Sequence, residues 1–118
     1  MTVLIVDDDA DIRASLQDFF EDQGFEVATA ADGLQALDLL EEEKLPCVVV
    51  LDLLMPQLDG NEVYDRMQKD PRLANVPVIV STSDPSRAPS GALIMRKPVN
   101  LDRLLRVVRQ HCADGCNP

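Results

Sequence analysis

Five polar side chains of this chain follow short apolar runs, and their types are those that handle phosphoryl groups and metal ions. They are Asp7, Asp8, Asp52, Thr82 and Lys97. Asp52 is the most informative, because an aliphatic run precedes it and a proline and an Asp-Gly pair follow it. A carboxylate at the end of a buried strand emerges at the sheet edge, where the loop presents it to solvent, ions and a second protein.

The chemistry that these residue types permit is phosphoryl transfer to a carboxylate. Three carboxylates at one edge repel each other, and a hard divalent cation is the simplest means of holding them together at neutral pH. We expect Mg²⁺, which takes one or two carboxylates together with phosphate oxygens. Asp52 can then attack phosphorus and form an aspartyl-phosphate. Lys97 offers a positive charge and Thr82 a hydroxyl donor to the phosphoryl oxygens.

Each of these residues also has a purely structural interpretation. Asp7, Asp8 and Asp9 are suited to capping a helix, where the helix dipole favours negative charge. Thr82 alone is most often a turn residue, and Lys97 alone is most often a solvated charge. All five stand at the ends of predicted strands, and this coincidence favours the functional interpretation.

The elements that must position these side chains alternate between strand and helix along the whole chain. Strands are predicted at residues 3–6, 26–30, 47–51, 78–80 and 92–95. Helices are predicted after Asp9 or Asp11, after Asp32, over residues 61–69 and after Asn100. This alternation predicts an α/β fold with a parallel, doubly wound sheet, in which ligands bind beyond the carboxyl ends of the strands.

Composition and charge limit the class of protein. We expect one soluble domain over residues 1–118, with a short flexible C-terminal tail from about residue 113. The net charge of −10 argues against direct contact with nucleic acid and favours a metal ion or a basic patch on a partner. The chain begins without a signal-peptide pattern and has no apolar segment of membrane-spanning length, so we expect no membrane contact and a cytoplasmic location.

The three cysteines, Cys47, Cys112 and Cys116, cannot all pair with one another, which fits a reducing compartment. Cys47 is expected to open a strand as a small hydrophobic residue. His111, Cys112 and Cys116 offer metal ligands in principle. No second ligand pair accompanies them, so we do not expect a metal site in the tail.

Four motifs occur in a fixed order along the chain. They are Val6-Asp7-Asp8-Asp9, Asp52 with Met55-Pro56 and Asp59-Gly60, Thr82, and Lys97-Pro98. As a set they resemble the receiver domain of two-component response regulators, in particular the stand-alone chemotaxis type, over nearly the whole chain. The resemblance implies a flavodoxin-like fold with a five-stranded parallel sheet in the order 2-1-3-4-5.

The resemblance also implies a role for each site residue. Asp52 would accept a phosphoryl group from a histidine kinase, a phosphotransfer protein or a small phosphodonor. Asp8, Asp52 and the backbone carbonyl of Leu54 would bind Mg²⁺ directly, and Asp7 would bind it through water. Lys97 and Thr82 would contact the phosphoryl group, with Thr82 as the sensor. Such a protein is not an enzyme beyond its own phosphorylation and dephosphorylation, and it signals by contact with a downstream protein.

Two features depart from the family pattern. The segment over residues 83–91 is about seven residues shorter than the family leads one to expect and contains Pro85 and Pro89, so the fourth helix should be shortened to one turn or missing. Ile94 stands where the family often has an aromatic residue that swings inward on phosphorylation. We therefore hypothesise that phosphorylation orders the 83–91 loop and that this loop contributes to the readout.

Two other functions compete with a working phosphoacceptor. A pseudo-receiver would keep the fold and the acidic edge but would act as a protein-docking module without phosphorylation. The short loop and Ile94 favour this alternative, whereas the complete set of site residues opposes it. A phosphatase with an aspartate nucleophile usually needs a second acid two residues later, where this chain has Leu54. A flavin site is disfavoured because no phosphate-binding loop follows the first strand.

Overall fold

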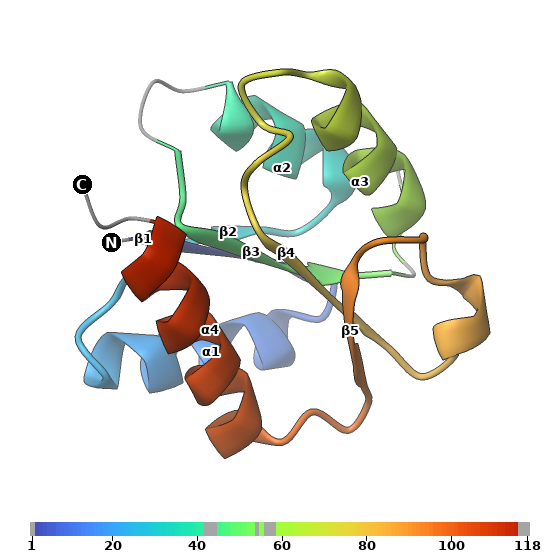
Figure 1. Cartoon of the computed structure of the whole chain (residues 1–118). Coiled ribbons are helices and arrows are strands. Elements are labelled where there is room, and N and C mark those ends of the chain that lie inside the picture. Colours follow the sequence, from blue (N-terminus) through green and yellow to red (C-terminus); the bar gives the residue numbers. More distant parts are fainter. Residues whose placement is uncertain (1, 42–44, 54, 56–58, 116–118) are drawn as a thin grey trace.

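The computed structural model describes residues 2–41, 45–53, 55 and 59–115, and its centre is a five-stranded parallel sheet (Figure 1). The strands are β1 (Thr2–Val6), β2 (Glu26–Ala30), β3 (Val48–Asp52), β4 (Val78–Thr82) and β5 (Leu93–Arg96). They lie in the order β2-β1-β3-β4-β5. The predicted doubly wound, flavodoxin-like sheet is therefore confirmed.

Helices cover both faces of this sheet (Figure 1). On one face lie α1 (Ala10–Asp22) and α4 (Leu101–Gly115), and on the other lie α2 (Gly33–Leu40) and α3 (Gly60–Lys69). The alternating residues of β3 supply both cores, since Val50 packs in the cluster under α1 and α4 whereas Val49 and Leu51 pack in the cluster under α2 and α3. A strand buried on both faces reads as the continuous apolar run seen in the sequence.

The predicted helix starts are confirmed by their capping bonds. The Asp9 carboxylate accepts hydrogen bonds from the backbone N–H groups of the first turn of α1, and Asp32 does the same for α2. Asn100 Oδ1 accepts a bond of 3.0 Å from the third residue after it, at the start of α4. Asp59 caps α3 in the same way. Short polar side chains at these positions satisfy N–H groups that have no partner within the helix.

The connection between β4 and β5 holds a single 3₁₀ turn, η1 (Pro85–Arg87), in place of a helix. This confirms the prediction of a shortened fourth helix. Strand β5 begins and ends one residue later than predicted, and α4 runs to Gly115, past the residue at which the sequence predicted the tail to begin. Within the described residues no helix is long and apolar enough to cross a membrane.

One covalent feature was not predicted from the sequence. A disulfide joins Cys47, just before β3, to Cys112 on α4, and both residues are buried. The description of Cys47 as only a small hydrophobic residue was therefore incomplete. The disulfide also removes Cys112 as a metal-binding thiolate, and Cys116 lies outside the described residues.

Candidate functional site

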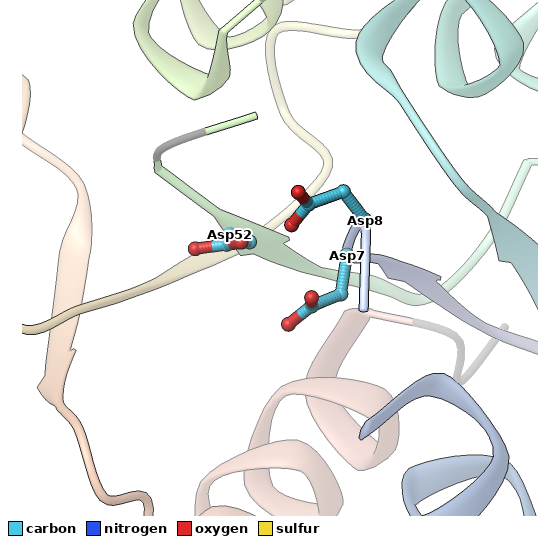
Figure 2. Close-up of side chains that lie close together, drawn as sticks. All are labelled: Asp7, Asp8 and Asp52. Atoms are coloured by element: carbon cyan, nitrogen blue, oxygen red, sulfur yellow. The ribbon is translucent and has the colours of Figure 1, made fainter. Parts of the chain in front are cut away.

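Three carboxylates meet where β1 and β3 end (Figure 2). Asp7 and Asp8 directly follow β1, and Asp52 is the last residue of β3. Each of the three offers a carboxylate oxygen, and these oxygens lie within 4.8 Å of one another. Asp7 and Asp52 are only 4 % and 5 % exposed, whereas Asp8 is exposed. The sequence prediction that these acids converge is correct for all three.

Lys97 supplies the positive charge of the site. Its Nζ donates a hydrogen bond of 3.1 Å to Asp52 Oδ1 and lies 3.9 Å from Asp7 Oδ2. The backbone N–H of Lys97 donates to the Thr82 carbonyl at 2.8 Å, which fixes the residue after β5 against the end of β4. The peptide bond from Lys97 to Pro98 is cis. One cation thus contacts two carboxylates, and the third carboxylate has no ion-pair partner among the described residues.

Burial and repulsion shape the electrostatics of this cluster. Burial raises the pKa of the Asp52 carboxyl above its ordinary value, the hydrogen bond from Lys97 acts in the opposite direction, and the negative charge of Asp7 raises the pKa further. Burial also raises the pKa of Asp7, against the backbone hydrogen bond that Asp9 donates to it. Ionised carboxylates in such surroundings gain from an added cation, and a set of carboxylate oxygens is the donor type that Mg²⁺ prefers.

The loop that carries the acids is held by contacts that the sequence analysis did not identify. Asp7 Oδ1 accepts a bond of 2.9 Å from the backbone N–H of Asp9. Arg13, one turn into α1, donates from Nη1 to the backbone carbonyl of Asp7 at 2.7 Å. An arginine close after three consecutive aspartates was a visible signal, but its target is a main-chain atom that no side-chain pattern reveals.

Thr82 is 2 % exposed and has a local partner. Its Oγ1 accepts a hydrogen bond from the Asp84 N–H at 3.0 Å and lies 3.3 Å from the Asp84 carbonyl oxygen, to which it donates. Asp84 in turn caps η1 by accepting a bond from the Ser86 N–H. The Thr82 hydroxyl therefore connects the site to the turn that replaces the fourth helix.

A single cleft of about 220 Å³ brings the predicted residues together. Asp7, Asp8, Asp52, Thr82 and Lys97 all line it. The remaining predicted ligand, the carbonyl of Leu54, lies outside the described residues. A cleft with two buried carboxylates, a lysine and a hydroxyl at the carboxyl ends of parallel strands has the groups needed to accept a phosphoryl group on an aspartate.

Comparison with known proteins decides the family. The sequence model of the response regulator receiver domain matches residues 3–109. The chain is a receiver domain of the response-regulator family. Solved receiver domains share its fold: that of a signal transduction histidine kinase from Syntrophus aciditrophicus superimposes with a TM-score of 0.89 at 26% identity, covering 99% of this chain and 93% of its own.

Relatives of the receiver domain include a named response regulator, which is consistent with two-component signalling. The domain is 33% identical to sporulation initiation phosphotransferase F of Bacillus subtilis, over 92% of this chain and 91% of that protein. It is 34% identical to response regulator Rre1 of Synechocystis, over 92% of this chain but only 50% of that protein. The receiver domain thus spans half the length of Rre1 and nearly all of the Bacillus protein.

Proposed function

We propose that this receiver domain accepts a phosphoryl group on Asp52 in a Mg²⁺-dependent reaction. The donor is a histidine kinase or a phosphotransfer protein, and the output is contact with a downstream protein in the cytoplasm. The observation that carries the proposal is that one cleft of about 220 Å³ holds Asp52 together with Lys97, Thr82 and two further carboxylates. The net charge of −10 supports a protein partner over nucleic acid.

Asp52 acts as the nucleophile. One carboxylate oxygen forms a bond to phosphorus while the bond from phosphorus to the donor's imidazole nitrogen breaks, and the donor takes up a proton as it leaves. Lys97 lies 3.1 Å from Asp52 Oδ1, so its ammonium group is placed to neutralise the charge of the incoming phosphoryl oxygens. Because such transfer needs little covalent chemistry from the protein, placing these charges is the main contribution.

The acids of the cluster fit a Mg²⁺ ion. Asp8 and Asp52 would bind it directly, together with the Leu54 carbonyl, and Asp7 would bind it through water. The carboxylate oxygens lie within 4.8 Å of one another, and the two buried acids have raised pKa values that an added cation would lower. When bound, Mg²⁺ supplies positive charge to the phosphoryl oxygens.

The signal would leave the site through the Thr82 hydroxyl. A phosphoryl group on Asp52 competes for this hydroxyl, which now bonds to Asp84, the residue that caps η1. On the far side of η1, Asn61 of α3 donates to the Arg87 carbonyl at 3.0 Å. The hypothesis that phosphorylation orders the 83–91 loop is therefore amended, because this turn is already capped by Asp84 and tethered by Asn61. We propose instead that phosphorylation rearranges a turn that is already formed.

The proposal is tested by incubating the protein with acetyl phosphate, with and without Mg²⁺, and measuring its intact mass beside that of an Asp52→Asn variant. We expect a phosphoryl adduct on the parent protein only, and only with Mg²⁺. An intact fold that binds Mg²⁺ but gains no adduct would overturn phosphoryl transfer and favour the docking module. The short loop and the exposed Ile94, which offers no aromatic switch, are the features that favour that alternative.

A further inference from the structure

The disulfide between Cys47 and Cys112 lies apart from the phosphoacceptor site and has no part in the function proposed above. The two residues are 65 apart in sequence, and their Cα atoms are 5.1 Å apart. That separation falls within the range in which a disulfide forms without backbone movement. Cys47 is 4 % exposed and Cys112 is 1 % exposed, so the pair belongs to the core under α4.

The position of the bond in the fold gives it a mechanical role. Cys47 directly precedes β3, and its backbone N–H donates to the Thr2 carbonyl at 2.8 Å, which anchors it to β1. Cys112 lies near the end of α4, on the face that also buries Leu104 and Val108. The bond therefore ties the end of the last helix to the start of the strand whose other end carries Asp52.

We propose that Cys47 and Cys112 are a reversible redox modification site, a staple that holds α4 on the sheet when oxidised and releases its end when reduced. The co-reactant is a low-molecular-weight disulfide. The thiolate of one cysteine attacks this disulfide and forms a mixed disulfide, releasing one small thiolate. The second cysteine attacks the mixed disulfide at the protein sulfur and releases the other. Two protein thiols lose two electrons and two protons, and the small disulfide becomes two thiols.

Burial determines how fast the staple responds. Exchange requires a solvent-exposed thiolate, and both cysteines are buried in the folded state. The end of a helix opens locally far more often than the centre of a sheet, so fraying of α4 is the step that admits the co-reactant. In a reducing compartment disulfides are usually transient. The staple therefore responds slowly to a sustained oxidant.

The first test is to map the thiols. The reduced protein is incubated with glutathione disulfide, and the thiols that remain are alkylated in denaturant and counted by intact mass, with peptide mapping of the bond. We expect three modified cysteines before oxidation and one, Cys116, afterwards. The control variant Cys116→Ser should still form the bond, and Cys47→Ser should lose it. A bond that maps to Cys112 and Cys116, or one between two molecules, would overturn the proposal.

The second test measures the hold on α4 by amide hydrogen exchange. Oxidation of the parent protein should slow exchange in the last two turns before Cys112 at least about tenfold, because the crosslink restricts the open states of the helix. The Cys112→Ser variant should exchange at the same rate with and without oxidant. Equal rates in the oxidised and reduced parent would refute the staple. Repeating the experiment in Asp52→Asn separates the effect of the disulfide from that of phosphorylation. We expect this variant, which lacks the proposed phosphoacceptor, to form the same disulfide and to show the same slowing of exchange.

Discussion

The mutual repulsion of the three carboxylates makes a quantitative prediction about Asp8. Its carboxylate has no ion pair or hydrogen bond among the described residues, and it lies near the charges of Asp7 and Asp52. Two unit charges 4.8 Å apart repel by roughly 1 kcal/mol in water and roughly 3.5 kcal/mol at an effective dielectric constant of 20. Because Asp8 is exposed, the lower figure applies to each of its two interactions.

Replacing Asp8→Asn should therefore raise the free energy of unfolding by about 1–2 kcal/mol in the presence of a chelator. In Mg²⁺ the order should reverse, because the parent protein gains the free energy of binding the ion, about 2.7 kcal/mol at a hundred times the dissociation constant. Urea denaturation followed by circular dichroism, in chelator and in Mg²⁺, measures both values. Asp18→Asn is the matched control, since it removes one exposed negative charge from α1 outside the cluster.

Two results would refute this reasoning. If Asp8→Asn and the parent protein had equal stability in chelator, the repulsion within the cluster would not destabilise the fold. If Asp18→Asn were stabilised as much as Asp8→Asn, the gain would come from net charge and not from the cluster. If Mg²⁺ stabilised the parent and Asp8→Asn equally, Asp8 would not be a ligand of the ion.

Three further predictions concern the site and its supports, and each is checked by urea denaturation. In chelator, Asp52→Asn should be more stable than the parent above about pH 4, and the difference should grow as the pH rises. The reason is that the pKa of Asp52 is raised in the folded state, so ionisation of this carboxyl destabilises the folded parent. Below about pH 4 the parent carboxyl is protonated in both states, and the variant should have no advantage. Arg13→Gln should lower the free energy of unfolding by about 1 kcal/mol, because it removes the hydrogen bond to the Asp7 carbonyl. The control Arg66→Gln breaks only the exposed ion pair with Glu62, at 3.6 Å, and should lower the free energy of unfolding by less than about 0.5 kcal/mol. Gly60→Ala should destabilise by about 3 kcal/mol, because the added Cβ would lie 2.6 Å from the Asp52 carbonyl oxygen.

The features that the sequence predicted are those set by local chemistry. An aliphatic run that ends in an acid predicted the burial of β3 and the place of Asp52 at its carboxyl end, but the expectation that Asp52 is presented to solvent was wrong, because its side chain is only 5% exposed. Asp9, Asp32 and Asn100 marked helix starts, because a capping side chain acts within three residues of its own position. Pro89 marked the loss of the fourth helix, since proline cannot continue an α-helical hydrogen-bond ladder.

The features that escaped prediction depend on which distant atoms meet. The bond from Arg13 to a main-chain carbonyl requires the turn between β1 and α1 to be known. The disulfide requires the packing of α4 against β3, and with three cysteines the sequence allowed three different pairs. The raised pKa of Asp52 depends on burial, which three-dimensional packing sets.

Strand β3 links the two proposed sites, because Asp52 is its last residue and Cys47 stands just before its first. The strand is buried along its whole length between β1 and β4, as β4 itself is, so it belongs to the most constrained part of the fold. Beside each end lie segments outside the sheet: the Thr82–Asp84 turn and η1 at the Asp52 end, and the last turns of α4 at the cysteine end. If both proposals hold, we expect the domain to respond to phosphorylation and to oxidation on separate surfaces.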